Sequence, residues 1–459
     1  MEKKRIILCC DGTWNEAERL DNESRQYATN VLKTVRALSP VDEATGIQQL
    51  IFYQPGIGTS GVGQFLRTLG RFIGGCSGLG ISRNIQDCYR FLANNYVPGD
   101  EIYLFGFSRG AYTARSLAGM IGSVGLLRKS DMDLLPEVYE YYRTAPEKRD
   151  FSPYHERVVQ LDRRFPKIRF LGVWDTVGAL GLPVPGLQHL SRKWVGFHDT
   201  HLGRHVEHAY HAVAIDERRR PFKPAMWTRL DGQISCQQVW FSGVHSNIGG
   251  GYADHGLSDV ALMWLVKRAQ RLGLRFNETY LFDAGKVIPD AMDKLEDSFT
   301  LPYKFLQWLG VLPYRRPIGE EQNQNEMIHE SVIRRILEEP DYRPVNLLPH
   351  DPSNEMYPLV SFVDQRNVLQ VKDKQVPVFR ERQYERVILE NCPATLIDEQ
   401  GLVVNCDILD YSDGGGARVQ MESLPTPGTM VSLDSRRFGL QEATVVWTNG
   451  SEAGIRYAA

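Results

Sequence analysis

Short apolar runs that end at glycine, aspartate or serine recur along the first 241 residues of the chain. They cover residues 5–10, 49–53, 101–105, 167–174 and 237–241. Continuous apolar runs of this length, bounded by turn-forming residues, are typical of strands buried on both faces of a parallel sheet. The pattern therefore predicts a sheet whose strands are buried.

Helical patterns occupy stretches between these runs. The apolar positions that share one helical face of residues 85–96 are Ile85, Cys88, Tyr89, Leu92 and Tyr96. Residues 111–124 and 258–272 have a similar helical pattern. Strands that alternate with helices predict an α/β fold with a doubly wound, mostly parallel sheet.

The pattern changes near the C-terminus, where from about Val376 the chain contains only strand-like runs. These are residues 403–409, 417–421, 430–433, 443–447 and 453–457, separated by clusters of turn residues. Short strands at regular spacing predict a small β-barrel. We expect an α/β domain over residues 1–350, a linker over 351–377 and the barrel over 378–459.

The end of the first domain, from about residue 285, is the least regular part of the pattern. It holds two helix candidates, near residues 300–312 and 325–337. We expect this stretch to form a helical extension of the α/β domain.

Composition excludes several classes of protein. Of 459 residues, 42% are hydrophobic and 24% are charged, which is ordinary for a globular chain and argues against disorder. The net charge of −3 provides no overall attraction to a nucleic-acid polymer. The seven cysteines are scattered without a Cys-x-x-Cys pair, which fits neither a disulfide framework nor a zinc knuckle.

The apolar runs are also short. The run after Met1–Arg5 is shorter than the apolar core of a signal peptide, and no run approaches the length of a membrane span. Together with the unpaired cysteines, this favours a cytoplasmic setting, with non-classical export left open.

Gly106-Phe-Ser-Arg-Gly110 follows a predicted strand and precedes a helix rich in small residues. This is the context of a nucleophile elbow, in which glycines permit the sharp turn that exposes Ser108. An ordinary strand–helix turn would give the same pattern. A serine nucleophile needs a base, and the base needs a group that orients it.

Asp175 and His245 follow at or near the ends of later predicted strands. The order Ser108, Asp175, His245 is that of α/β-hydrolases, and open α/β sheets place their sites at the carboxyl ends of strands. For the oxyanion hole, the N–H of Arg109 and the backbone at Asp11 and Gly12 are the candidates. An Asx turn after the first strand explains the last two equally well.

Two further patterns favour weaker interpretations. Five histidines lie between His198 and His211, and the spacing of His201, His205 and His208 would suit one face of a helix, which suggests a metal site or a polar structural cluster. Residues 56–61 match a dinucleotide fingerprint, but no acidic residue follows about 20 residues later. We expect residues 53–81 to form a glycine-rich loop over the site.

Five ordered motifs carry a family resemblance. They are Cys10-Asp-Gly-Thr-Trp-Asn15, Gly106-Phe-Ser-Arg-Gly-Ala-Tyr-Thr-Ala-Arg115, Gly172-Val-Trp-Asp-Thr-Val-Gly178, His211-Ala-Val-Ala-Ile-Asp-Glu217 and Val244-His-Ser-Asn-Ile-Gly-Gly-Gly-Tyr252. Together they resemble the α/β-hydrolase family known as DUF2235, over roughly residues 3–350. Its known members include phospholipase effectors of type VI secretion.

The resemblance implies an α/β-hydrolase fold, a Ser108–Asp175–His245 triad and hydrolysis of carboxylic esters, with phospholipids as the best-known substrates. We expect no metal or cofactor in catalysis. One departure is Asn247, where the family pattern has an acidic residue. Asn247 is not a triad member, so its effect would fall on contacts near the site.

The C-terminal segment carries a second resemblance. Arg382 and Arg386 are four residues apart, and arginines at this spacing can grip a phosphate or stack on a base. Asp410-Tyr-Ser-Asp-Gly-Gly415 contains a small glycine turn that lets backbone N–H groups approach a phosphate. Within an all-β segment this pair of motifs resembles a PilZ domain, whose ligand is cyclic di-GMP. The resemblance assigns ligand contacts to Arg382, Arg386, Asp410, Ser412 and Gly415.

The sequence thus favours a serine esterase that acts on a phospholipid or another lipid ester and is regulated by cyclic di-GMP. Such a substrate implies peripheral membrane contact, and no nucleic-acid polymer is expected as a partner. Two alternatives stay open. One is a cyclic di-GMP-responsive adaptor with an idle hydrolase fold, and the other is a metal-dependent phosphoesterase. The barrel would be a docking module if it binds no nucleotide.

Overall fold

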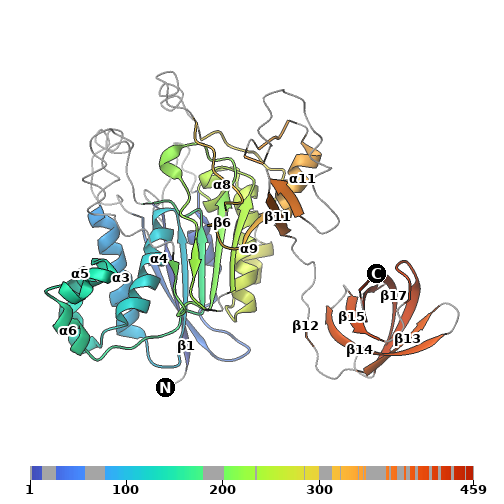
Figure 1. Cartoon of the computed structure of the whole chain (residues 1–459), viewed down its shortest axis with the longest axis horizontal. Helices are drawn as coiled ribbons and strands as arrows, with labels where there is room; N and C mark the ends of the chain where they lie inside the picture. The colour runs from blue at the N-terminus through green and yellow to red at the C-terminus, as the bar shows by residue number, and fades with distance from the viewer. Residues whose placement is uncertain are drawn as a thin grey trace. The chain divides into compact units, whose positions relative to one another are not determined.

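The chain forms two compact units, Met1–Phe379 and Arg380–Ala459, in a computed structural model (Figure 1). The structure describes residues 3–12, 27–56, 78–178, 201–232, 235–283, 285–298, 313–320, 322–339, 341–344, 346–347, 368–371, 374–379, 387–388, 393–398, 402–412, 416–421, 425–435, 439–449 and 451–457. No helix of these residues is long and apolar enough to cross a membrane.

A nine-stranded sheet runs through the first unit in the order β10-β11-β9-β8-β6-β4-β3-β1-β2, and all neighbours are parallel except β10 and β11. Its strands are β1 (Lys4–Cys10), β2 (Gln48–Gln54), β3 (Glu101–Phe107), β4 (Phe170–Trp174), β6 (His208–Ala214), β8 (Ser235–Phe241), β9 (Glu326–His329), β10 (Val368–Val371) and β11 (Lys374–Phe379). The two-residue strands β5 (His201–Leu202) and β7 (Arg229–Leu230) pair separately. The predicted α/β fold with a mostly parallel sheet is confirmed.

Helices cover both faces of this sheet (Figure 1). They are α1 (Asn30–Ala37), α3 (Gly78–Asn95), α4 (Arg109–Val124), α5 (Leu135–Arg143), α6 (His155–Gln160), α8 (His245–Gly249), α9 (Gly256–Arg271) and α11 (Glu330–Glu338). Short 3₁₀ helices lie at η2 (Lys129–Leu134), η3 (Pro146–Phe151) and η4 (Arg220–Phe222), and a π-helical turn at η5 (Thr279–Asp283).

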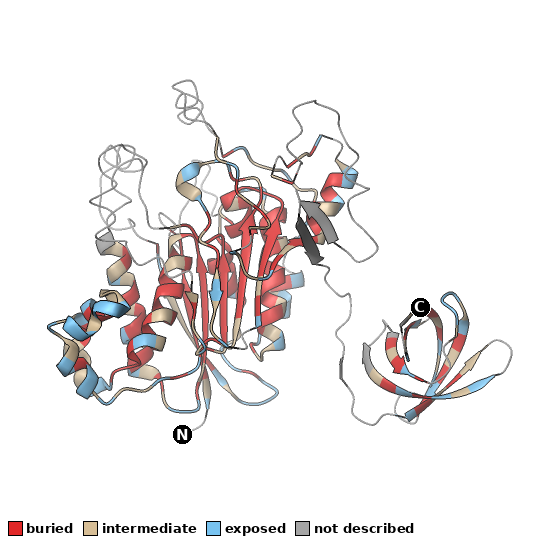
Figure 2. Cartoon of the chain, viewed as in Figure 1, coloured by how far each residue is buried: buried red, intermediate tan, exposed pale blue. Residues whose placement is uncertain are grey.

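Strand β1 shows how the sequence produces two cores. Ile6 and Leu8 point into the core under α3 and α4, whereas Ile7 and Cys9 point into the core under α1 and α9. Successive side chains of a strand point to opposite faces, so a strand with helices on both sides must be apolar throughout. Figure 2 shows the resulting band of buried residues along the sheet.

The extension after residue 285 differs from its prediction. The helix expected near 325–337 was wrong in its first part, because residues Glu326–His329 form strand β9 and helix α11 begins only at Glu330. His329 caps that helix, since its Nδ1 accepts the N–H of Ser331 at 3.2 Å. Pairing with β8 extends the buried sheet and overrides the helical pattern. The helix expected near 300–312 lies outside the described residues.

The expected linker, 351–377, contains sheet structure at its end. Strands β10 and β11 form an antiparallel hairpin, and β11 pairs with β9 through Val378 and Phe379. The sheet of the first unit therefore continues to residue 379, and residues 351–367 lie outside the described part of the chain.

The second unit contains a closed six-stranded antiparallel barrel in the order β14-β13-β16-β17-β18-β15, with β15 returning to β14, which confirms the predicted barrel. Its strands are β13 (Pro393–Asp398), β14 (Val403–Ser412), β15 (Gly416–Gln420), β16 (Met430–Ser435), β17 (Gly439–Asn449) and β18 (Glu452–Tyr457), with β12 (Val387–Ile388) added to β14. Leu396, Ile408, Val419, Leu433 and Val445 belong to its core.

Candidate active site

Ser108 occupies a sharp turn between β3 and α4. Its φ of 57° and ψ of −120° lie outside the regions that side-chain-bearing residues prefer. Glycine is required on both sides of it. A Cβ on Gly106 would lie 2.6 Å from the Cα of Ala111, and one on Gly110 would lie 2.2 Å from the carbonyl oxygen of Cys10. The helix can begin directly at the strand end only because these positions carry no side chain.

His245 begins α8 and contacts the serine. Its Nε2 lies 2.8 Å from the Oγ of Ser108. The imidazole lies between two aromatic rings, with centroid distances of 4.7 Å to Phe107 and 4.9 Å to Phe222. This apolar packing buries the ring and restricts its rotation.

Asp175 directly follows β4 and contacts the other side of the imidazole. Its Oδ2 lies 2.5 Å from the Nδ1 of His245, and its side chain is fully buried. A carboxylate at Nδ1 favours the tautomer in which Nδ1 carries the proton, so Nε2 can accept the hydroxyl proton of Ser108. The structure thus brings together all three residues that the sequence suggested as a triad.

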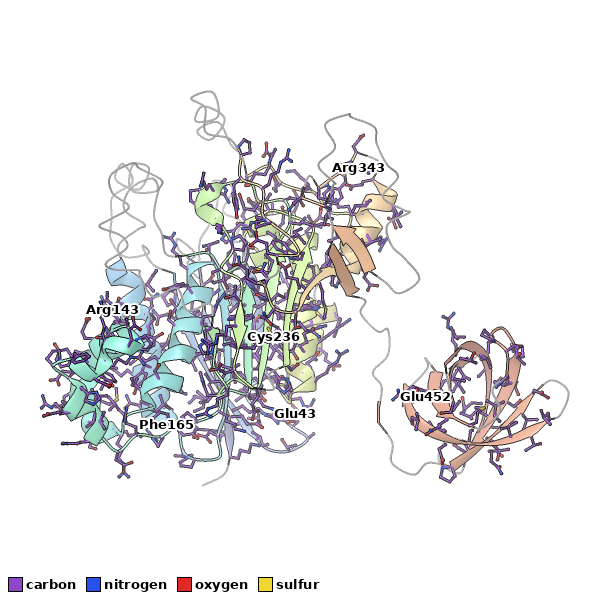
Figure 3. All side chains as sticks on the ribbon, viewed as in Figure 1. Glu43, Arg143, Phe165, Cys236, Arg343 and Glu452 are labelled. Carbon is purple, nitrogen blue, oxygen red and sulfur yellow. The ribbon has the colours of Figure 1, made fainter. Side chains whose placement is uncertain are left out.

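The site lies at the carboxyl edge of the sheet, because Ser108 follows β3, Asp175 follows β4 and His245 lies four residues beyond β8. In Figure 3 the label of Cys236 marks the start of β8, and the site lies at the other end of that strand. Open α/β sheets bind their ligands at this edge.

Arg316 is a site residue that sequence reasoning missed. Its Nη1 lies 2.5 Å from Asp175 Oδ1, and its Nη2 lies 2.9 Å from Asp175 Oδ2. The same two nitrogens donate to the carbonyl oxygens of Ala214 and Phe222 at 2.8 and 2.5 Å. Arg316 is fully buried and lies 141 residues from Asp175 in the sequence. An arginine pair in an irregular segment gives no signal of this contact.

These charges set the protonation of the acid and the base. Burial acts to raise the pKa of Asp175, but the charge of Arg316 and the hydrogen bond from His245 outweigh it and hold that pKa well below its usual range. Burial lowers the pKa of His245, against the opposing effect of Asp175. At neutral pH the site therefore contains an ionised acid and a neutral imidazole.

The motif from His211 to Glu217 supports both triad loops. The N–H of Ala214 donates to Asp175 Oδ1 at 2.9 Å, and the N–H of His245 lies 3.3 Å from Glu217 Oε2. His211 itself accepts the N–H of Thr176 through Nε2 at 3.0 Å, and burial lowers its pKa to about 3. His211 is therefore a neutral acceptor that holds the backbone next to the triad acid.

The suggested oxyanion residues lie at the neighbouring strand end. The N–H of Asp11 donates to the carbonyl oxygen of Gln54 at 2.9 Å, within the sheet. The N–H of Gly12 donates to the Asp11 carboxylate at 2.6 Å, an arrangement of the Asx type. Arg109 is the first residue of α4, directly after the serine.

The described histidines of the 198–211 cluster lie apart. His201 is on β5 near Asp231, His205 lies 2.7 Å from the carbonyl oxygen of Ala118, and His208 and His211 are on β6. These histidines therefore do not share one helical face, because His208 and His211 lie in a strand that pairs with β4 and β8. Within the ranges that the structure describes, no three His, Cys, Asp or Glu side chains form a metal-binding group.

Asn247 fastens the segment after α9 to the histidine helix. Its Oδ1 accepts the N–H groups of Val244 and Glu296 at 3.3 and 3.2 Å, and its Nδ2 donates to the carbonyl oxygen of Lys294 at 3.4 Å. A carboxylate could not donate that last hydrogen bond. The amide therefore suits a structural contact at this position.

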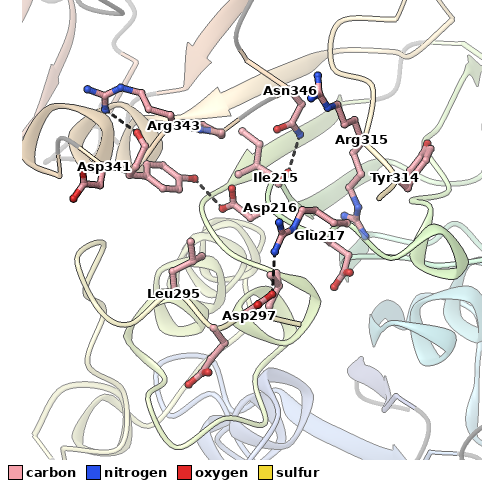
Figure 4. Close-up of a pocket in the computed structure, with 16 residues that line it drawn as sticks. Ile215, Asp216, Glu217, Leu295, Asp297, Tyr314, Arg315, Asp341, Arg343 and Asn346 are labelled. Atoms are coloured by element: carbon pink, nitrogen blue, oxygen red, sulfur yellow. Dashed lines mark hydrogen bonds and ion pairs between the residues drawn. The ribbon is translucent and has the colours of Figure 1, made fainter. Parts of the chain in front are cut away.

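A cavity of about 300 Å³ lies beside Arg316, the ion-pair partner of Asp175 (Figure 4). Its lining includes Arg316, Glu217 and Val244, and Figure 4 shows Arg315 and Tyr314 beside it. The wall opposite contains the hydrogen bond between the hydroxyl of Tyr342 and Asp216, at 2.9 Å. The buried arginine therefore borders a cavity, although its side chain is closed off from solvent.

The suggested nucleotide contacts belong to the second unit. Asp410 and Ser412 are on β14, where their backbones pair with Arg418 and Gly416 of β15. Arg382, Arg386 and Gly415 lie outside the described residues.

Comparisons with known proteins identify the family of this chain. A family model described as the catalytic domain of Tle1-like type VI secretion phospholipase effectors matches residues 4–268, which is more than half of the chain. An uncharacterized protein of Saccharomyces cerevisiae, YEL023C, is 32% identical over 243 residues, covering 50% of this chain and 33% of that protein. The chain thus spans about a third of the length of this curated relative.

Two solved structures are similar to parts of this chain. An uncharacterized protein from Pseudomonas aeruginosa is 17% identical with a TM-score of 0.34, covering 60% of this chain and 46% of that one. The Tle1 effector bound to the VgrG spike is 21% identical with a TM-score of 0.26, covering 55% of this chain and 52% of that one.

Proposed function

Because the chain belongs to the family of Tle1-like phospholipase effector catalytic domains, we propose that it is a serine esterase that hydrolyses phospholipids or other lipid esters. Membership of this family supports lipase or esterase chemistry. The observation that carries the serine mechanism is the pair of hydrogen bonds that joins Ser108, His245 and Asp175.

In the proposed reaction Ser108 attacks the ester carbonyl carbon while His245 Nε2 takes the hydroxyl proton. The tetrahedral intermediate then expels the alcohol, which receives that proton from His245, and water repeats the sequence to release the fatty acid. Asp175 holds the imidazole and stabilises its charged form. The N–H of Arg109 and the backbone at Gly12 would stabilise the oxyanion, if Gly12 turns away from the Asp11 carboxylate.

Release of fatty acid from vesicles of phosphatidylethanolamine and phosphatidylglycerol tests this proposal. We expect release by the native chain in the presence of EDTA, and its loss in Ser108→Ala, because the nucleophile is removed. A fluorophosphonate probe should label the native chain and not the variant. Equal release by both proteins would contradict the serine mechanism, and release abolished by EDTA alone would favour a metal-dependent phosphoesterase.

We further propose that the C-terminal unit binds cyclic di-GMP and regulates the esterase in the cytoplasm, where this messenger acts. A closed barrel, together with the arginines at 382 and 386 and the Asp-Gly-Gly sequence after Ser412, supports the proposal. Titration calorimetry should detect binding that is lost in Arg382→Ala/Arg386→Ala.

Two outcomes would change this assignment. Absence of binding by the native chain would leave the barrel as a docking module. Binding without hydrolysis of vesicles or short-chain esters would favour the adaptor with an idle hydrolase fold.

A further inference from the structure

We propose that Arg316 is a positioning residue of this hydrolase, which fixes Asp175 as an oriented carboxylate and so sets the pH range in which His245 acts as a base. The inference rests on the proposed serine mechanism. Arg316 lies beyond residues 4–268, the part of the chain that the family model matches. It would add a fourth residue, from a distant segment, to the three of the triad.

The geometry of the contact is specific for an arginine. Two nitrogens of one guanidinium face two oxygens of one carboxylate, at 2.5 and 2.9 Å. Such a paired contact defines both the position and the plane of the carboxylate, which a single ammonium group cannot do. The side chain of Arg316 is fully buried, so water does not screen the interaction.

Each oxygen of Asp175 has one further partner. The N–H of Ala214 donates to Oδ1 at 2.9 Å, and His245 Nδ1 lies 2.5 Å from Oδ2. Without Arg316, the carboxylate would keep only the N–H of Ala214 and the imidazole that it must itself orient. Arg316 also donates to the carbonyl oxygens of Ala214 and Phe222, and the Phe222 ring packs on His245. The arginine thus connects the acid to a wall of the imidazole site.

Stability alone is a weak reason for this ion pair. Taking two charges out of water is costly, and buried pairs in other proteins can often be replaced by apolar residues without loss of stability. A buried guanidinium that also leaves its Nε without a hydrogen-bond partner is an expensive way to join two segments. The need to hold Asp175 in a fixed orientation in the active site explains this buried ion pair better than stability does.

The charge has a defined effect on the pH profile. Asp175 and His245 are coupled, so they take up their first proton as a pair. Removing the positive charge of Arg316 makes that first proton bind more readily, whether it binds to Asp175 or to His245. Once the pair holds this proton, His245 cannot accept the proton of Ser108. The acid limb of the profile should therefore move to higher pH.

Other charged groups also face this pair. Glu217 and Arg219 are close enough to affect the pKa of His245, and they are joined by an ion pair at 2.8 Å. His211 lies near Asp175, but burial keeps it neutral. These groups are unchanged in the Arg316 variants, so a shift of the profile can be assigned to the arginine.

The test compares Arg316→Ala and Arg316→Lys with the native chain on p-nitrophenyl butyrate, between about pH 5 and 9. In Arg316→Ala we expect kcat/KM at neutral pH to fall by about 100-fold, mainly through kcat, which is a typical effect of misplacing a catalytic group. The acid limb should rise by about one pH unit or more. Arg316→Lys should restore the position of the limb but only part of the rate, because it keeps the charge and loses the paired contact.

Chemical rescue provides a second readout. Arg316 lines the cavity of about 300 Å³, so a small cation can reach Asp175 in the alanine variant (Figure 4). Millimolar ethylguanidinium should raise the activity of Arg316→Ala, whereas ethylammonium should raise it less. Arg315→Ala is the matched control, because Arg315 lies on the same cavity, and it should retain native activity and show no rescue.

Three results would overturn the inference, provided that Arg316→Ala unfolds at the same temperature as the native chain. They are native activity of Arg316→Ala, a uniform loss of rate with an unchanged acid limb, and absence of rescue. If the native chain hydrolyses no ester, the proposed function fails separately. Titration of His245 by ¹⁵N-histidine NMR then decides the role of Arg316, because the midpoint should be higher in Arg316→Ala and an equal midpoint would exclude the role.

Discussion

Backbone strain is concentrated at the candidate site. Among the described residues other than glycine, only Ser108, Asp175 and Asn325 have a positive φ, and two of these three belong to the triad. Such conformations are costly and persist where surrounding contacts determine them. For Asp175, with a φ of 38°, the hydrogen bond from its N–H to the carbonyl oxygen of Ala212 and the contacts of Arg316 provide that support.

Substitution of the triad acid should affect rate far more than folding. In Asp175→Asn the amide can present an N–H to His245, which favours the wrong tautomer, so we expect kcat to fall on the order of 10³–10⁴-fold. Steady-state hydrolysis of p-nitrophenyl butyrate measures the effect. Asp297→Asn, at an exposed ion pair, is the matched control and should retain native kcat. A similar kcat for the two variants would refute the role of Asp175.

The lowered pKa of His245 predicts activity in mildly acidic solution. The base must be neutral, and it becomes charged only as the pH falls through its folded-state pKa. Since burial places that pKa below the ordinary histidine value of about 6.5, kcat/KM of the native chain should decline only below that pH. A pH profile on a soluble ester checks this, and an acid limb above about 6.5 would contradict it.

At the scale of elements, the sequence pattern predicted the strands that are apolar throughout, and missed those whose apolar character is interrupted. Strand β6 contains His208 and His211, and those histidines suggested a helix or a metal site. These residues form a strand because they lie in the centre of the sheet, where pairing with both β4 and β8 requires an extended backbone. Order along the chain placed Ser108, Asp175 and His245 correctly at one edge. Arg316 could not be predicted, since its contact depends on how an irregular segment returns to the sheet.

Close packing of α8 on β3 should make Gly249 intolerant of a side chain. A Cβ there would lie 1.9 Å from the ring of Phe107, which also packs on His245. We expect Gly249→Ala to destabilise the first unit by about 1–3 kcal/mol, the usual cost of overpacking. The new methyl group should also displace the Phe107 ring. Because that ring packs on His245, we expect the esterase activity to fall as well. Denaturant unfolding and ester hydrolysis measure the two effects.

A second substitution can show whether Gly249→Ala is destabilising because of the clash with Phe107 or because α8 tolerates no side chain at this position. Phe107→Leu removes part of the ring that would meet the new methyl group. The double variant should therefore be less destabilised than the sum of the two single variants. Strict additivity would show that the clash with Phe107 is not the cause.

The whole molecule contains two units with separate hydrophobic cores. The first unit, Met1–Phe379, packs its cores around the parallel sheet, and the second, Arg380–Ala459, packs its own inside the barrel. A closed barrel has no unpaired sheet edges among its six strands and satisfies its backbone internally. Regulation of one unit by a ligand of the other requires that the ligand bind two states of the chain with different affinity.

Calorimetry of the full chain can measure both folding and this coupling. Because each unit has its own core, we expect two unfolding transitions. Cyclic di-GMP at 100 times its dissociation constant should stabilise the barrel by about 2.7 kcal/mol through mass action, and so raise the transition of the barrel. Arg382→Ala/Arg386→Ala should abolish that rise. A rise in the second transition as well would mean that nucleotide binding also stabilises the hydrolase unit, which is the coupling that regulation needs. If neither transition moves, the barrel does not bind the nucleotide.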